Sequence, residues 1–261
     1  MTKIIDTHAH IYLKDFEEDI EEVITNSKES GIEHIFMPNI NSATIDRMLR
    51  LEERFNDYCI PMMGLHPCYV KDDYKKELNN IETWLKKRDF CAVGEIGIDL
   101  YWDKTFISEQ KKAFEIQVQL AKDLEIPIII HCRDSIDMTI DLVEKHQDGK
   151  LTGIFHCFTG QIEQAHRIID LGFLLGIGGV VTFKNGGLDK IVGKLDLANM
   201  VLETDSPYLA PTPFRGKRNK PQYINQIANK VAELQDCELS KVAKTTSENA
   251  LSLFRHEKSK S

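Results

Sequence analysis

Residues 109–131 read EQKKAFEIQVQLAKDLEIPIIIH, and this stretch decides the fold class. Its first part, Glu109–Leu124, carries apolar residues on one face at helical spacing, which predicts an amphipathic helix. Its second part, Ile126–Ile130, is a short apolar run rich in β-branched residues, which is typical of a buried strand. A helix leading directly into such a strand predicts parallel pairing, because parallel strands need a crossover connection that is usually helical.

The same pattern repeats along the chain. Eight apolar runs recur at intervals of roughly 20 to 35 residues, and helical stretches such as Ile136–Val143 and Ile162–Leu171 lie between them. Gly31 and Gly172 follow helical stretches, as C-terminal caps do. The predicted strands are Lys3–Asp6, Ile32–Met37, Cys59–Met63, Cys91–Val93, Ile126–Ile130, Gly153–Phe155, Phe173–Ile177 and Met200–Leu202. Eight such units in 261 residues favour an α/β fold of the closed (β/α)8 type, a TIM barrel, over an open doubly wound sheet.

Composition excludes several classes of protein. The chain is 42% hydrophobic and 28% charged, which is too apolar for a disordered protein. No apolar run approaches the ~20 residues that span a membrane, and the start of the chain lacks the pattern of a signal peptide. Six scattered cysteines indicate reduced thiols, so we expect a cytoplasmic protein with no membrane and no obligate protein partner. We find no linker, so we expect one domain over residues 1–255 and a polar tail over 256–261.

Titratable side chains stand at or just after the ends of six predicted strands. Because all strands of a parallel barrel open their carboxyl ends onto one face, we expect these groups to converge. The first two are histidines two residues apart, so on an extended backbone both rings point into the barrel. The residues are His8, His10, His66, Glu95, His131, His156 and Asp205.

Imidazole and carboxylate ligands together suit a divalent cation, which we expect to be zinc, manganese, magnesium or nickel. Four histidines and two carboxylates at these strand ends exceed what one tetrahedral site takes. Two metal ions that share a bridging carboxylate fit this count better. Glu95 is the natural bridge, because it comes from a middle strand. Cys132 and Cys157 directly follow two of the histidines, so strand alternation predicts that they pack away from the metal face.

A pair of divalent ions predicts a class of chemistry. Two ions clamp a water between them and lower its pKa toward neutrality, which gives a hydroxide for the hydrolysis of an ester, an amide or a phosphodiester. Asp205, at the end of the last strand, is the candidate group that takes a proton and passes it to the leaving group. Asp6 and Glu203 lie two residues before ligands and are expected to orient them.

A cationic loop follows the last predicted strand. It carries four cations in six residues, Arg215, Lys217, Arg218 and Lys220, within a chain of net charge −8. Such a charge run is often only a solvated loop. Barrel enzymes commonly hold phosphate near the loops after strands seven and eight, so its position favours phosphate binding.

Other residues near the same face are candidates for contact with the substrate. Arg133 lies two residues after a predicted ligand and could grip a phosphate oxygen, and His66 is expected to contact the substrate. Tyr101, Trp102 and Phe158 either stack on a base or cover the cleft, and we prefer the covering role.

Motifs along nearly the whole chain resemble those of the TatD family of metal-dependent hydrolases, among the amidohydrolase-like barrels. The motifs are Asp6–His10, Gly64–Pro67, Gly94–Asp99 with Tyr101-Trp102, Pro127–Ser135, Phe155–Gly160, Gly176–Gly179, Leu202–Leu209, Arg215–Asn219 and Asn249-Ala250. The resemblance implies a TIM barrel with two divalent cations. It places His8, His10 and Asp205 on the first ion, His131 and His156 on the second, and Glu95 between them.

Family members are metal-dependent deoxyribonucleases, several of them 3′–5′ exonucleases on single-stranded DNA. The first hypothesis is therefore a phosphodiesterase that binds DNA ends locally. Hydrolysis of a small ester, lactone or amide at the same centre is the alternative, and a non-catalytic binding protein on a retained barrel is a third. The sequence departs from the family pattern at Ile11-Tyr12, where relatives often have Leu-Asp, and at Lys220, where Glu often stands.

Overall fold

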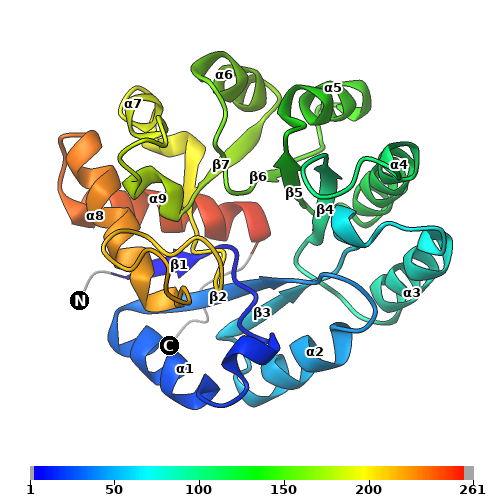
Figure 1. Cartoon of the computed structure of the whole chain (residues 1–261), viewed down its shortest axis with the longest axis horizontal. Coiled ribbons are helices and arrows are strands. Elements are labelled where there is room, and N and C mark those ends of the chain that lie inside the picture. The colour runs from blue at the N-terminus through cyan, green and yellow to red at the C-terminus, as the bar shows by residue number, and fades with distance from the viewer. Residues whose placement is uncertain (1–2, 256–261) are drawn as a thin grey trace.

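The computed structural model describes residues 3–255, and its strands and helices alternate around a barrel (Figure 1). All the paired strands are parallel, as the helix-to-strand pattern predicts. The eight predicted apolar runs all contain or overlap a strand, so the prediction of an eight-stranded α/β barrel is confirmed. The strands are β1 (Ile4–Asp6), β2 (Ile32–Pro38), β3 (Cys59–Met62), β4 (Val93–Asp99), β5 (Ile128–Arg133), β6 (Gly153–Phe155), β7 (Phe173–Ile177) and β8 (Met200–Leu202).

Two ladders of hydrogen bonds make up the barrel wall, one in the order β1-β2-β3 and the other running from β4 to β8. Isolated bridges connect them at both seams. Met63 pairs with Val93 between β3 and β4, and Ala9 pairs with Ser206 just beyond the ends of β1 and β8. At the second seam the backbone amide of Asp205 also donates to the carbonyl oxygen of His8, at 2.8 Å. This seam therefore joins the two segments that carry predicted ligands.

The helices surround the strands, and their buried positions recur at helical spacing. In α4, for example, the buried residues include Ala113, Phe114, Val118 and Ala121, at the spacing that predicted an amphipathic helix there. Gly31, which follows α1, has a φ of 88°, a left-handed conformation that glycine adopts freely. The helices are α1 (Ile20–Glu29), α2 (Ile45–Arg54), α3 (Tyr74–Lys87), α4 (Ile107–Leu124), α5 (Ile136–His146), α6 (Ile162–Asp170), α7 (Asp189–Val192), α8 (Ile224–Leu234) and α9 (Leu239–Phe254). Short 3₁₀ helices are η1 (Lys14–Phe16), η2 (Pro67–Tyr69), η3 (Gly179–Thr182), η4 (Leu197–Asn199) and η5 (Pro221–Tyr223).

The apolar core has two layers. The larger layer lies between the strands and the surrounding helices. The smaller one fills the barrel interior and includes Ile129, Ile154 and Val201, each two residues before a functional side chain of the same segment. Helix α9 crosses the ring of strands in Figure 1 and adds Ala250 and Phe254 to this inner layer. The inner layer therefore closes one end of the barrel and leaves the carboxyl ends of the strands for the site.

The boundaries of β4 and β5 differ from those predicted. The sequence places the end of the fourth strand at Val93 and that of the fifth at Ile130, whereas β4 continues to Asp99 and β5 to Arg133. Glu95 and His131 therefore lie within strands. Glycines and a charged residue made the segment after Val93 look like a loop, but the glycine at 94 leaves room for the neighbouring strand. A Cβ atom there would lie 2.7 Å from the Cβ atom of Ile129.

Among residues 3–255 no helix is both long and apolar enough to cross a membrane. The predicted polar tail, 256–261, lies outside the described residues.

We expect Phe254→Ala to lower the free energy of unfolding by about 3 kcal/mol, because it removes a buried ring from the inner layer. The ring of Phe254 stacks on that of Phe36, with centroids 4.1 Å apart. Urea denaturation followed by circular dichroism measures the change. Ser252→Ala, an exposed position in the same turn of α9, is the matched control and should leave the midpoint unchanged. Equal midpoints for the two variants would show that α9 does not close the barrel.

Candidate metal centre

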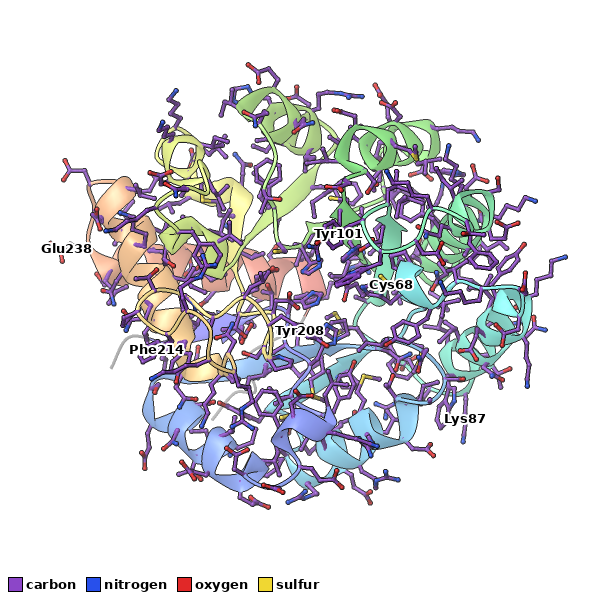
Figure 2. All side chains as sticks on the ribbon, viewed as in Figure 1. Cys68, Lys87, Tyr101, Tyr208, Phe214 and Glu238 are labelled. Carbon is purple, nitrogen blue, oxygen red and sulfur yellow. The ribbon has the colours of Figure 1, made fainter. Side chains whose placement is uncertain are left out.

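A cleft of about 910 Å³ opens at the carboxyl ends of the strands. Figure 2 shows Cys68, Tyr101 and Tyr208 near the middle of the ring of helices, around this opening. Predicted site residues from six segments line it: His10, His66, Glu95, His131, Arg133, His156 and Asp205. His8 is fully buried and contacts the same group of side chains. The structure therefore brings together all six predicted ligands, although they are spread over almost two hundred positions.

Glu95 lies at the centre of the cluster, and its two carboxylate oxygens face different sets of imidazoles. Oε2 lies 3.1 Å from Nε2 of His8 and 3.3 Å from Nε2 of His10. Oε1 lies 2.8 Å from Nδ1 of His131 and 2.9 Å from Nε2 of His156. A single carboxylate thus faces two groups of nitrogen ligands at once.

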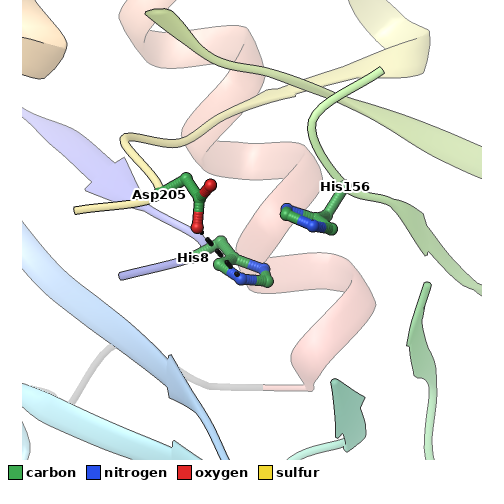
Figure 3. Close-up of side chains that lie close together, drawn as sticks. All are labelled: His8, His156 and Asp205. Carbon is green, nitrogen blue, oxygen red and sulfur yellow. Dashed lines mark ion pairs between the residues drawn. The ribbon is translucent and has the colours of Figure 1, made fainter. Parts of the chain in front are cut away.

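Three groups of side chains among the described residues could hold a cation, because their ligand atoms all lie within 4.8 Å of one another. One contains His8, His156 and Asp205 and is drawn in Figure 3. The second contains His8, His10 and Glu95, and the third contains His66, Glu95 and His131. The third group gives His66 a possible role that the sequence did not indicate, since it was expected only to contact substrate.

The spacing of these atoms fits a bound cation. Nε2 of His8 lies 3.2 Å from Nε2 of His10, and Oδ1 of Asp205 lies 3.7 Å from each of them. Ligands about 2.1 Å from a tetrahedral cation lie about 3.4 Å from one another, which is close to these separations. Oε2 of Glu95 is buried and has no hydrogen bond. The imidazole nitrogens of His8 and His10 therefore converge with carboxylate oxygens at separations suited to a cation. Nitrogen and oxygen ligands of this kind are typical of a divalent metal site.

Glu203 holds one of the imidazoles. Its Oε1 lies 3.2 Å from Nδ1 of His156 and accepts a hydrogen bond from the backbone amide of Cys157. Gly176 provides the space for this carboxylate, because a Cβ atom at that position would lie 2.3 Å from Oε2 of Glu203. The prediction that Glu203 orients a ligand therefore has a geometric counterpart, although the ligand is His156, just after β6, and not Asp205.

Asp6 acts on the backbone instead of on an imidazole. Its Oδ1 accepts hydrogen bonds from the amides of His8 and Thr204, and Oγ1 of Thr204 donates to its Oδ2 at 2.6 Å. Asp6 therefore ties the segment after β1 to the segment after β8. Burial raises the pKa of Asp6 to about 8, and the hydrogen bonds from Thr204 only partly oppose this effect.

Asp99 is a residue of the site that sequence reasoning missed. Its Oδ2 lies 2.9 Å from Nε2 of His131, and its Oδ1 accepts the backbone amides of Tyr101 and Trp102. A signal was present in the sequence, because Asp99 follows Glu95 by four residues and side chains at that spacing share one face of a strand. Because the predicted fourth strand ended at Val93, Asp99 was not recognised as lying on the same face of the strand as Glu95.

Tyr12 is the second missed residue. Its hydroxyl donates to the carbonyl oxygen of Pro38 at 2.5 Å, so its oxygen is left to accept from Nδ1 of His10 at 3.0 Å. That bond leaves Nε2 of His10 with its lone pair toward the cluster. Position 12 is where the sequence departs from the usual family pattern, and here a phenol supplies the partner of the imidazole.

Burial and neighbouring charges shift the ionisation of the cluster. Burial raises the pKa of Asp205 to about 6, although His156 and His10 lower it. Burial would also raise the pKa of Glu95, but the charges of the surrounding imidazoles outweigh it and hold the pKa well below its usual range. Burial would lower the pKa of His156, but Glu95 and Glu203 outweigh it and raise that pKa well above its usual value.

The cationic loop lies outside the cleft wall. The residues that line the cleft do not include Arg215, Lys217 or Arg218. Arg218 forms two hydrogen bonds with the carboxylate of Asp19, and the guanidinium of Arg215 lies 3.6 Å from the ring centroid of Phe183. The expectation that the loop faces the substrate is therefore not matched by its geometry, because at least two of its cations are held by other parts of the chain.

Three further predictions concern residues beside the cleft. Arg133 lines it, as expected, and its guanidinium lies 3.7 Å from the ring centroid of Tyr101. Phe158 is buried in the hydrophobic core and so cannot stack on a base. Cys132 and Cys157 both line the cleft, so the prediction that they face away is wrong. For Cys157 the reason is its φ of 47°, which interrupts the strand alternation on which the prediction was based.

Comparisons with known proteins agree with this geometry. A family model described as "TatD related DNase" matches residues 5–255. The uncharacterized metal-dependent hydrolase YabD of Bacillus subtilis is 37% identical to the chain, over 97% of this chain and 99% of its own length. A protein of Pantoea ananatis named 3′-5′ ssDNA/RNA exonuclease TatD is 28% identical, over 96% of this chain and 99% of its own. The crystal structure of YjjV, a TatD homologue from Escherichia coli, superposes with a TM-score of 0.92 at 28% identity and covers 98% of this chain and 99% of that one.

The family match, the near-complete coverage and the histidine-carboxylate cluster all lead to the same assignment. The chain belongs to the TatD family of metal-dependent hydrolases.

Proposed function

We propose that this hydrolase cleaves phosphodiester bonds in nucleic acid ends, with two divalent metal ions held on either side of Glu95. The observation that carries the proposal is the carboxylate of Glu95, whose Oε2 faces His8 and His10 while Oε1 faces His131 and His156. A bridging carboxylate between two nitrogen-rich sets is the usual framework of a two-metal hydrolase. The similarity to a relative named as a 3′-5′ ssDNA/RNA exonuclease supports the choice of substrate and the direction of attack.

In this proposal His8, His10 and Asp205 would hold the first ion, and His131 and His156 would hold the second. His66 stands near the second set, with its Nε2 3.3 Å from Oε1 of Glu95, where it can contact either the ion or the substrate. The ions are zinc, manganese, magnesium or nickel, and when bound they supply Lewis acidity and lower the pKa of a coordinated water.

The side chains of the chain itself orient the substrate and move the proton. Oδ1 of Asp205 faces His8 and His10, which leaves Oδ2 as the atom that takes a proton from the attacking water and returns it to the leaving oxygen. The carboxylate lies in the cleft wall, within reach of a bound substrate. Arg133, at the edge of the same wall, is placed to contact a phosphate oxygen.

A second candidate substrate is a small ester, lactone or amide. The observation that favours it is the scarcity of positive charge in the cleft, since Arg133 is the only lysine or arginine among the described residues that line it. The decisive comparison assays metal-loaded protein side by side on end-labelled single-stranded DNA, RNA and simple carboxyl esters. We expect products shortened from the 3′ end; hydrolysis of the carboxyl esters alone would replace the proposal with its alternative.

Asp205→Asn should lower kcat by two or more orders of magnitude, because the amide cannot accept the proton while the shape of the side chain is kept. Turnover of an end-labelled strand at saturating metal measures the loss. Asp170→Asn, at an exposed position in α6, is the matched control for the loss of a carboxylate. Near-normal turnover of Asp205→Asn would remove this residue from its proposed role.

Chelation should abolish activity but lower the melting temperature only modestly, since the two core layers do not include the cluster. Metal analysis after reloading should give two ions per chain, and Glu95→Gln should bind fewer. One ion per chain in the fully active protein would contradict the proposed pair, and global unfolding on chelation would show that the metal also holds the fold together.

A further inference from the structure

The exposed apolar side chains of the chain are concentrated at one place. Residues 3–255 expose seven large hydrophobic side chains, and two of them lie on α4. The other five surround the mouth of the cleft: Tyr69, Tyr101, Trp102, Tyr208 and Leu209. Trp102 is the most exposed of all, at 69%. Exposed apolar side chains gathered in one place mark a binding surface, and three of these aromatic residues, Tyr69, Trp102 and Tyr208, line the same cleft as the candidate metal centre. We call the four aromatic residues of this set the aromatic rim.

The loop that carries Tyr101 and Trp102 is held firmly despite its exposure. Both backbone amides donate to Oδ1 of Asp99, at 2.9 and 3.1 Å, and Asp99 is almost fully buried. The guanidinium of Arg133 lies over the ring of Tyr101, and the two rings of the loop meet edge to face at a centroid distance of 5.0 Å. The loop therefore holds both rings beside the mouth of the cleft while leaving each side chain more than half exposed.

Tyr208 supplies an aromatic surface on another side of the mouth. It follows β8, whereas Tyr101 and Trp102 follow β4, and these two strands lie at opposite ends of one ladder. Figure 2 shows Tyr101 and Tyr208 apart, on either side of the opening. The backbone of Tyr208 is fixed, because its amide donates to the carbonyl oxygen of Asp205 and its own carbonyl oxygen accepts from the Asn219 side chain. Its ring lies 6.2 Å from that of His10, so a group stacked on it would adjoin the candidate metal centre.

The charges around the mouth indicate what these rings bind. The chain carries a net charge of −8, and Arg133 is the only lysine or arginine among the described residues of the cleft wall. Such a cleft gains little affinity by neutralising many phosphates along a strand. Aromatic faces bind unpaired bases by stacking regardless of base identity, whereas a duplex hides the faces of its bases.

We infer that the aromatic rim binds the unpaired bases of a single-stranded nucleic acid end, with Trp102 and Tyr208 as the stacking surfaces beside the scissile phosphodiester. The inference rests on the proposed function for the bond that is cleaved. It adds which residues of this chain recognise the strand, and that they do so by stacking on its bases.

The tryptophan content of the chain allows a direct test. The chain has two tryptophans, so Trp84→Phe leaves Trp102 as the only one and Trp102→Phe leaves only Trp84, in α3. Metal-loaded Trp84→Phe is titrated with a phosphorothioate strand of thymidines, with its RNA counterpart, with a duplex and with an abasic strand of the same length. We expect the base-bearing single strands to quench the fluorescence and the abasic strand not to do so. Metal-loaded Trp102→Phe, the matched control, should show no quenching with any of them.

Kinetics test the same inference independently. Trp102→Ala should lose the stacking of one base, so its kcat/KM on a single strand should fall about tenfold, mainly through a higher KM. Trp102→Phe should recover much of this loss, because a phenyl ring still offers a face to the base. Tyr208→Ala should act in the same direction. Trp102→Ala should also lose most of the preference of the wild-type protein for a base-bearing over an abasic strand, which a purely structural defect would not produce.

The inference is overturned if abasic and base-bearing strands quench equally, or if the duplex binds as tightly as the single strands. It is also overturned if no strand quenches the fluorescence, which is the result expected if the rim binds a protein instead. An unchanged kcat/KM in Trp102→Ala would also overturn it. Failure of the proposed function gives a different result: the wild-type protein then hydrolyses no phosphodiester, including bis(p-nitrophenyl) phosphate, and the fluorescence titration still decides whether the rim stacks on bases.

Discussion

The buried carboxylate of Glu95 is the constraint on which the rest of the site depends. It lies within β4 at 1% exposure, where an ionised group costs several kcal/mol unless charged or polar partners surround it. Imidazoles from four other segments provide those partners, and their charges keep the pKa of Glu95 well below its usual range. The geometry of these imidazoles is therefore set by one anion, which is also the group placed to join two cations.

Three of the imidazoles have a further partner outside the pair of carboxylate oxygens of Glu95. Tyr12 accepts from His10, Asp99 contacts His131, and Glu203 contacts His156. Contacts of this kind orient a ligand and set which nitrogen faces the metal. They also extend outward: Asp99 holds the backbone of the loop that carries the exposed rings, so the position of His131 and the shape of the cleft mouth depend on the same carboxylate.

Stability and function are separated along the barrel axis. The inner core layer and α9 close one end, whereas the cluster of charges and the exposed rings occupy the other. This separation allows the site end to keep buried polar atoms without hydrogen bonds, such as Nδ1 of His8 and Oε2 of Glu203, because the apolar end supplies the free energy of folding. The cleft can therefore change its specificity through its loops without altering the core.

The amino-acid sequence by itself determined the barrel, its eight strands and the convergence of six ligand candidates. These follow from patterns that local chemistry fixes: hydrophobic periodicity defines each strand and helix, and parallel topology brings the carboxyl ends of the strands to one face. Only the tertiary structure decided which side chains pair across the barrel. Asp19 lies 199 residues from Arg218 and binds it away from the cleft, and the close approach of Ile129 explains why a glycine interrupts β4 without ending it. Such pairings depend on the spatial meeting of distant segments, which no local pattern encodes.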